Sequence, residues 1–235
     1  MLNSTKFKVF VSLRSPFARR VRLTLTRVGI PFEEEIIDVF NPPSHFLALN
    51  PLGLVPTLVG PSGFVLSDSS MILEWAQVQT GRVYSIGARE WPERQASVLC
   101  EGVIQSTVLF FQETHMHEAP SPGWAREHSG VIAATLNTIE AMPRELFISA
   151  IGVGSSLGGA SRGAGSASRD GGTGGSDFAG EELTQAGWDL AVALEYLTLR
   201  LPTYDWSRLH SGFNSVMKFA QENEKFVATV PPVPT

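Results

Sequence analysis

The sequence has almost no cysteine: Cys100 is its single thiol in 235 residues. One cysteine excludes an internal disulfide, and this usage is typical of proteins kept in a reducing compartment. We therefore expect a cytoplasmic location. A dithiol redox motif is excluded for the same reason.

Long hydrophobic runs and an excess of basic residues are also missing. No stretch of 18 apolar residues is present, so no transmembrane helix and no membrane partner are expected. The first residues lack the apolar core and cleavage site of a signal peptide. The formal net charge of −5 argues against nucleic acid as a partner, because such partners select a basic face.

What is present is a chain with 43% hydrophobic residues, enough to build real cores. Its first part alternates between strand-like and helix-like segments, with turn residues between them. We expect strands at 7–11, 32–38, 57–59 and 64–66, and helices at 16–28, 42–49 and 68–78. This order predicts a small mixed sheet covered by helices.

From residue 90 onward the pattern is helical, with apolar residues at helical spacing. Helices are predicted at 93–117, 124–146, 183–199 and 209–223. The sequence therefore divides into an α/β domain at 1–80, a linker at 81–89 and an all-helical domain at 90–235. Residues 151–180 hold half of the chain's 22 glycines, which predicts a flexible Gly/Ser-rich insert between two helices.

Ser15 is the most informative candidate residue, because it lies where a strand ends and a helix begins. Backbone N–H groups and the positive end of the helix dipole stabilise a thiolate at such a place. A dithiol motif would need cysteine at 15 and 18, where this chain has Ser15 and Ala18. The site is therefore suited to a thiol that comes from outside the chain.

Three segments resemble the N-terminal domain of glutathione transferases, in order and in spacing. They are residues 15–22 (SPFARRVR), 50–58 (NPLGLVPTL) and 68–75 (DSSMILEW). Residues 188–197, 199–202, 205–206 and 228–232 resemble the late helices and the end of bacterial-type members. The resemblance covers nearly the whole chain except 148–181, and it implies a thioredoxin-like domain followed by a helical one.

The resemblance also implies roles for particular residues. The Val55–Pro56 bond is expected to be cis, leaving the Val55 backbone to pair with the cysteinyl part of glutathione. Ser69 is expected to bind the γ-glutamyl carboxylate, with Asp68 near the ammonium. Ser15 is expected to donate a hydrogen bond to the glutathione sulfur and lower its pKa.

Plainer interpretations of these residues remain. Ser15, Asp68 and Ser69 suit helix capping, which is compatible with binding. Val55–Pro56 suits an ordinary turn, and Ser12 is a weaker candidate for the role of Ser15.

The sequence departs from the family pattern at two places. Leu54 replaces a frequent lysine that contacts the glycine carboxylate of glutathione, and His45 or Arg14 is a candidate replacement. An aspartate that often caps the helix beginning near Thr184 is replaced by Gly187 or shifted to Asp189. The latter change leaves the stability of the helical domain in question.

The remaining patterns carry weaker signals. Basic residues of the first helix (Arg19, Arg20, Arg22, Arg27) are expected to form salt bridges with acids such as Glu33–Glu35. Three aromatic residues (Phe110, Phe111, Trp124) are candidates either for a second-substrate groove or for simple core. Cys100 is expected to be buried and inert, and His115 with His117 does not suggest a metal site.

The sequence as a whole predicts a glutathione transferase that activates the glutathione thiol for attack on an apolar electrophilic small molecule, a detoxification reaction. Glutathione is then a co-substrate, and neither a permanent cofactor nor a metal is expected. The family resemblance implies a homodimer. Two alternatives remain: a non-catalytic binding or scaffold protein with the same fold, and a glutathione-dependent reductase or dehalogenase.

Overall fold

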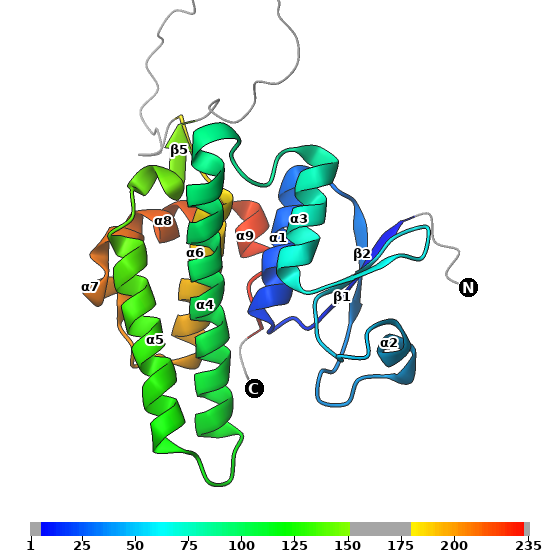
Figure 1. Cartoon of the computed structure of the whole chain (residues 1–235), viewed down its shortest axis with the longest axis horizontal. Helices are drawn as coiled ribbons and strands as arrows, with labels where there is room; N and C mark the ends of the chain where they lie inside the picture. Colours follow the sequence, from blue (N-terminus) through cyan, green and yellow to red (C-terminus); the bar gives the residue numbers. More distant parts are fainter. Residues whose placement is uncertain (1–5, 151–179, 233–235) are drawn as a thin grey trace, which may run out of the picture.

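A computed structural model describes residues 6–150 and 180–232. Figure 1 shows a small sheet with its helices on one side of the molecule and a bundle of long helices on the other. The expected combination of a thioredoxin-like α/β part and a largely helical part is confirmed. The proposed insert at 151–180 lies, apart from Gly180, outside the described residues.

The sheet has four strands in the order β2–β1–β3–β4. β1 (Phe7–Val11) pairs in parallel with β2 (Phe32–Ile36) and antiparallel with β3 (Thr57–Val59). β4 (Val65–Ser67) pairs antiparallel with β3 at the edge. β1 therefore lies inside the sheet, which explains its apolar sequence.

Alternation along β1 gives each face of the sheet its own core. Val9 and Val11 pack with residues of α1 (Pro16–Val28) and α3 (Ser69–Thr80). Phe10 points to the other face, where it packs with Phe46 of α2 (Ser44–Leu49). Two helices thus cover one face and a short helix covers the other.

α1 begins and ends as the sequence predicts. Ser15 is its N-cap, Pro16 is its first residue, and Gly29 follows its end with φ of 79°. A left-handed residue suits glycine, because it carries no Cβ that would clash. These signals placed both ends of α1 correctly.

Other boundaries of the first part differ from the prediction by one or two residues. β2 ends at Ile36, and β4 begins one residue later than expected. α2 begins only at Ser44, because Pro42 and Pro43 precede it and Pro43 has extended backbone. α3 continues to Thr80 and is preceded by its cap, Asp68.

Three helices form the centre of the second part: α4 (Glu90–His115), α5 (Pro122–Glu140) and α6 (Gln185–Arg200). α4 follows a short 3₁₀ turn, Gly87–Arg89. α6 is the most buried of them, with apolar side chains such as Leu190 and Leu194 fully enclosed. α4 and α5 pack side by side in front of α6 (Figure 1).

Two helix predictions in this part were wrong. The helix expected at 124–146 ends at Glu140, since Pro143 cannot continue it, and a 3₁₀ turn follows at Arg144–Leu146. The segment 209–223 contains the end of α7 (Trp206–Leu209), a 3₁₀ turn at Ser211–Phe213 and α8 (Asn214–Gln221). α9 (Glu224–Val227) follows.

The proposed insert is not flanked directly by helices. β5 (Ile148–Ala150) pairs antiparallel with β6 (Glu181–Leu183), so a two-stranded ladder closes its base.

The expectation for the cap of α6 was also wrong. Thr184 is the N-cap: its Oγ1 accepts a hydrogen bond from the Gly187 N–H at 3.1 Å. The same hydroxyl donates to the Leu146 carbonyl at 2.6 Å. Asp189 has a different task, described below, so the start of α6 is properly capped.

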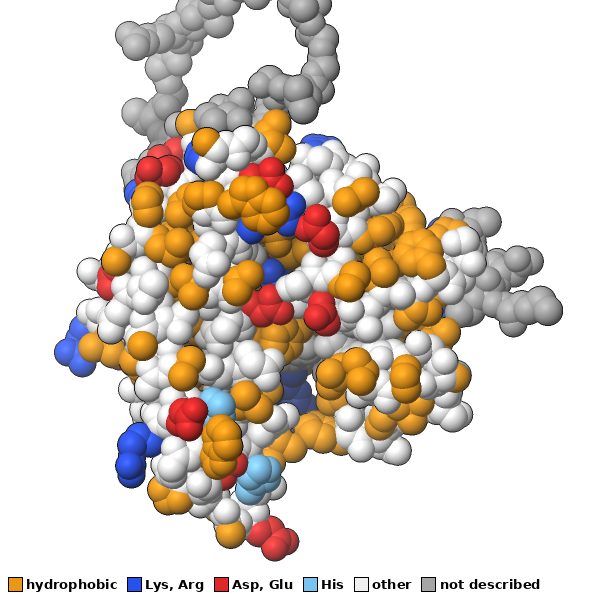
Figure 2. Space-filling model, in the orientation of Figure 1, with side chains coloured by type: hydrophobic (Ala, Val, Ile, Leu, Met, Phe, Trp, Pro, Cys, Tyr) orange, Lys and Arg blue, Asp and Glu red, His pale blue; other side chains and the backbone are white. Residues whose placement is uncertain are grey.

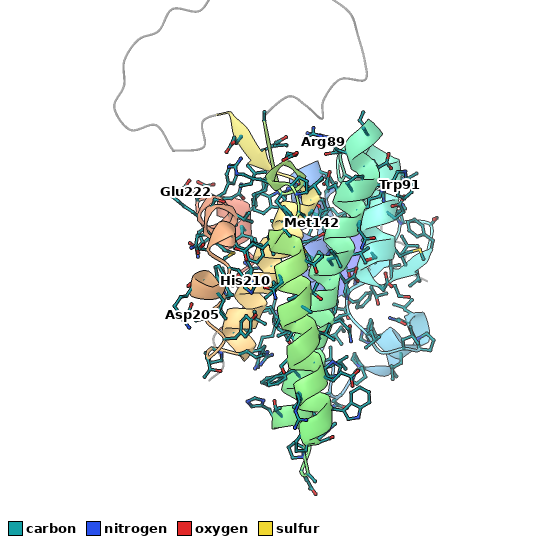
Figure 3. All side chains as sticks on the ribbon, turned by 60° about the vertical axis from the view of Figure 1, so that its left-hand side comes forward. Arg89, Trp91, Met142, Asp205, His210 and Glu222 are labelled. Carbon is teal, nitrogen blue, oxygen red and sulfur yellow. The ribbon has the colours of Figure 1, made fainter. Side chains whose placement is uncertain are left out.

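A buried histidine, His210, connects the C-terminal segments to α5 through a hydrogen bond with Glu140. Figure 3 shows His210 between α5 and the C-terminal segments. Its Nδ1 lies 2.9 Å from Glu140 Oε2, and its ring stacks between those of Tyr204 and Phe213. No helix in the described part combines the length and apolar character that crossing a bilayer requires.

Candidate functional site

A cleft of about 850 Å³ opens between the sheet part and the helical part. Figure 2 shows this hollow, with a basic side chain visible inside it. The N-terminal wall contains all five residues singled out from the sequence: Ser15, Val55, Pro56, Asp68 and Ser69. Side chains of α4 and α6 form the opposite wall.

Ser15 lies at the floor of this cleft as the cap of α1. Its Oγ accepts a hydrogen bond from the Ala18 N–H at 3.2 Å. A hydroxyl also has one proton to donate, and within the described residues no acceptor takes that proton. Ser12 lines the same cleft, so both serines remain candidates for contact with a sulfur atom.

The Val55–Pro56 loop is held from behind by buried polar groups. The peptide bond between Val55 and Pro56 is cis, as expected. The Asn50 side-chain amide donates to the Leu54 carbonyl at 3.0 Å and to Thr57 Oγ1 at 2.9 Å. Its carbonyl oxygen accepts from the Leu52 N–H. Sequence reasoning gave Asn50 no role, although an amide inside an apolar motif indicates a partner of this kind.

Asp68 and Ser69 lie at the start of α3. Asp68 has φ of 66°, unusual for a residue other than glycine, and its Oδ1 accepts from the Met71 N–H at 2.9 Å. Such a backbone costs about 1–3 kcal/mol and is often found at functional sites. Ser69 is buried, and its Oγ accepts from Arg20 Nη1 at 3.3 Å.

Arg20 is a residue that sequence reasoning placed wrongly. It is buried and does not reach Glu33–Glu35. Its Nε lies 2.8 Å from Asp189 Oδ1, and its Nη1 lies 2.9 Å from Glu101 Oε2. Burial alone would lower the pKa of the Arg20 guanidinium, but Asp189 and Glu101 raise it above its ordinary value.

The other arginines of α1 also bind mainly outside the sheet. Arg19 forms an ion pair with Glu195 and donates to the Phe226 carbonyl at 3.2 Å. Burial lowers the pKa of Arg19 to about 10. Arg22 alone among them follows the expectation, with its Nε 2.8 Å from Glu34 Oε1. α1 therefore ties the two parts of the molecule together.

The two candidates to replace the family lysine, His45 and Arg14, lie in different places relative to the cleft. His45 Nε2 lies 2.6 Å from Glu35 Oε1, and His45 does not line the cleft. Arg14 lines the cleft and is exposed. Leu54 also lines it with an exposed side chain. Of these two candidates, only Arg14 therefore lines the cleft.

The helical wall combines apolar and polar side chains. Phe111 lines the cleft, whereas Phe110 packs against the core and Trp124 stacks on His128 outside the cleft. Only one of the three candidate aromatic residues is thus a wall residue. Arg200, which sequence reasoning did not single out, lies beside Phe111.

Cys100 is fully buried, as expected, and burial raises the pKa of its thiol well above the ordinary value. Its thiol is therefore inert and outside the cleft. Among the described residues, no group of three His, Cys, Asp or Glu side chains is arranged to hold a metal ion.

Comparison with known proteins gives one consistent result. Residues 14–79 match the family model described as glutathione S-transferase, N-terminal domain. The chain is 42% identical over 59 residues to a probable cytosolic glutathione S-transferase, DHAR1, of Oryza sativa subsp. japonica. It is 29% identical over 145 residues to glutathione S-transferase U7 of Arabidopsis thaliana.

These alignments cover 25% and 61% of this chain, and 28% and 61% of the two relatives, so each spans less than two thirds of the relative. A solved glutathione S-transferase from Methylobacterium radiotolerans, in complex with glutathione sulfonate, is similar over 98% of this chain and 97% of its own. The TM-score is 0.75 and the identity is 24%.

The matched N-terminal segment, the relatives and the shared fold agree with the geometry of the cleft. Residues 14–79 therefore match the glutathione S-transferase N-terminal domain, and the whole chain has the fold of solved glutathione S-transferases.

Proposed function

We propose that this chain is a glutathione transferase that activates the glutathione thiol for attack on an apolar electrophilic small molecule. One observation carries the proposal. The Ser15 hydroxyl opens into the same cleft as the Val55–Pro56 loop and the Asp68–Ser69 turn. A thiol tripeptide spans such a set of groups, and glutathione sulfonate is bound in the similar structure from Methylobacterium radiotolerans.

Glutathione binds in an extended form along the N-terminal wall. The Val55 backbone pairs with the cysteinyl residue in the manner of an added strand. The Ser69 hydroxyl and the first N–H groups of α3 bind the γ-glutamyl carboxylate, and Asp68 attracts the ammonium. Arg20, behind Ser69, donates to the Ser69 hydroxyl oxygen and so leaves the hydroxyl proton free to be donated to the carboxylate.

Ser15 then donates its free O–H to the glutathione sulfur. A hydrogen bond to the charged form lowers the thiol pKa, so the thiol proton leaves to solvent. The thiolate attacks the electrophilic carbon. A C–S bond forms, and the leaving group departs with the bonding electron pair or, in an addition, the substrate accepts a proton.

Apolar side chains on both walls of the cleft support the proposal that the electrophilic substrate is apolar. Val108 and Phe111 of α4 face the cleft with Ile36 and Phe40 of the N-terminal part. Exposed apolar surface of this kind marks a binding site more often than chance would give. Detoxification of electrophiles is the role that fits this chemistry.

A titration of glutathione by calorimetry tests the proposal. Ser69→Ala removes one hydrogen bond to a carboxylate, so the Kd for glutathione should rise about tenfold or more. Ser62→Ala, in the exposed turn between β3 and β4, is the matched control and should leave the Kd unchanged. Turnover of 1-chloro-2,4-dinitrobenzene is followed in parallel.

Two results would contradict the proposal. Absence of glutathione binding in the unaltered chain would remove the site altogether. Tight binding without turnover of any electrophile would favour the non-catalytic scaffold.

We also propose a homodimer and a cytoplasmic location. α3 and α4 lie next to each other, joined by the Ser70 hydroxyl, which donates to Glu101 Oε2 at 2.5 Å. Large apolar side chains on these helices are exposed: Met71, Val78, Trp91 and Val98. Figure 2 shows apolar and charged side chains interspersed over this face, and the single cysteine supports the cytoplasm.

A further inference from the structure

We propose that the electrophile taken by this cleft carries an anionic group, a carboxylate or a group of like charge, and that Arg200 binds it. The inference rests on the proposed function and adds the substrate class. Arg200 is the last residue of α6 and lines the cleft on the helical wall.

The Arg200 guanidinium has no acidic partner. Within residues 6–150 and 180–232, no Asp or Glu side chain forms an ion pair with it, and its Nε is buried without a hydrogen-bond partner. Arg19 and Arg20, by contrast, are each paired with carboxylates. A partly desolvated cation without a counter-ion gains strongly from an anionic ligand.

Two aromatic rings hold this guanidinium in place. Its Cζ lies 4.1 Å from the centroid of the Phe111 ring and 5.5 Å from that of Tyr196. Stacking fixes the plane of the guanidinium, and a side-chain hydrogen bond with Tyr196 helps to hold it, while the other donors in its plane stay available. The fork is therefore preorganised for a planar, bidentate acceptor such as a carboxylate.

The acids that line the cleft are occupied elsewhere. Glu101 pairs with Arg20 and accepts from Ser70, and Asp68 caps α3. Asp38 accepts from the Phe40 N–H at 3.0 Å. None of them neutralises Arg200, so a ligand is the remaining source of negative charge.

The other side chains of the helical wall define the rest of the ligand. Val108, Phe111 and Met116 are apolar, and Gln105 and Gln112 are neutral. An anionic group on an apolar or aromatic body matches this wall. Arg14, on the opposite wall, is the other cation of the cleft that forms no ion pair within the described residues, and it is close in sequence to Ser15, which suits a carboxylate of glutathione.

The reaction of such a substrate needs no further reactant. With 4-(bromomethyl)benzoate, the glutathione thiolate attacks the benzylic carbon and a C–S bond forms. The C–Br bond breaks, and bromide leaves with the electron pair. The product is S-(4-carboxybenzyl)glutathione.

Calorimetric binding of two such conjugates tests the inference without relying on turnover. They are S-(4-carboxybenzyl)glutathione and S-(4-carbamoylbenzyl)glutathione, which differ in charge but hardly in shape. The unaltered protein should bind the carboxylate at least about tenfold more tightly, the effect of one charge-assisted hydrogen bond. Arg200→Met should reduce that ratio to about one, and Arg200→Lys should restore part of it.

Two controls complete the experiment. Arg208→Met, which removes an exposed arginine of α7, should leave the ratio unchanged. The Kd for unmodified glutathione should be the same in Arg200→Met as in the unaltered protein.

The outcomes separate the two proposals. If glutathione binds but the conjugates bind equally well to the unaltered protein, the inference is overturned and the proposed function stands. If Arg200→Met weakens glutathione itself, Arg200 serves a glutathione carboxylate and the inference is again overturned. If neither glutathione nor the conjugates bind, the proposed function falls, and this inference falls with it.

Discussion

Gly187 lies where α6 approaches the chain just before β5 so closely that a side chain does not fit. An added Cβ would lie 2.1 Å from the Phe147 carbonyl oxygen. From the sequence, this glycine was interpreted as a lost cap. In the structure, glycine is required here for packing: without a side chain, the backbone of α6 can lie against the backbone of Phe147.

Gly187→Ala should therefore destabilise the protein, by about 1–3 kcal/mol, because the backbone at Phe147 must move. Gly130→Ala is the matched control, since Gly130 lies in α5 with nothing near the added Cβ. There alanine should stabilise by up to about 1 kcal/mol. Equilibrium unfolding in urea measures both, and equal changes in the two variants would contradict this account.

Arg20 shows the limit of sequence reasoning at the residue scale. Four arginines in one helix and an acidic strand nearby favour local salt bridges, and only Arg22 forms one there. The partner of Arg20 is Asp189, 169 residues further along the chain. Such a pair depends on tertiary packing, so no local pattern in the sequence indicates it.

At the scale of helices and strands, the predicted boundaries were most accurate where capping residues mark the ends of an element. α1 was predicted to the residue because Ser15, Pro16 and Gly29 mark both of its ends. The helical part was less well predicted, since apolar spacing alone does not reveal breaks. Pro143 and Gly212 interrupt segments whose periodicity continues.

The candidate site was likewise better predicted in its N-terminal wall than in its helical wall. The five residues singled out from the sequence all line the cleft, because Ser15, Val55–Pro56 and Asp68–Ser69 belong to motifs at the starts of helices and strands. The roles given to them stay predictions. On the helical wall only Phe111 was among the candidates, and Arg200 was missed. Residues of that wall come from two helices far apart in sequence, so their meeting requires the fold.

For the whole molecule, the exposed apolar side chains of α3 and α4 lead to a prediction about assembly. Val98→Glu places a charge on this surface, and it should convert the proposed dimer to monomer at micromolar concentration. Trp91, 73% exposed near the start of α4 in Figure 3, belongs to the same surface. Sedimentation equilibrium measures the change in mass.

Val131→Glu is the matched control for this test. Val131 is 42% exposed on α5, away from the proposed surface, and its substitution should leave the mass unchanged. A monomeric unaltered protein would contradict the proposal, as would loss of the dimer in both variants.

The account of the whole molecule depends on one step, the activation of a bound thiol by Ser15. The most direct measurement is the pKa of the glutathione thiol in the complex, obtained from its thiolate absorbance as pH is varied. We predict that the pKa of bound glutathione lies about one unit or more below that of free glutathione, and that Ser15→Ala removes most of this shift while Ser12→Ala does not. An unshifted pKa in the unaltered complex, or a shift that survives Ser15→Ala and disappears in Ser12→Ala, would contradict the account.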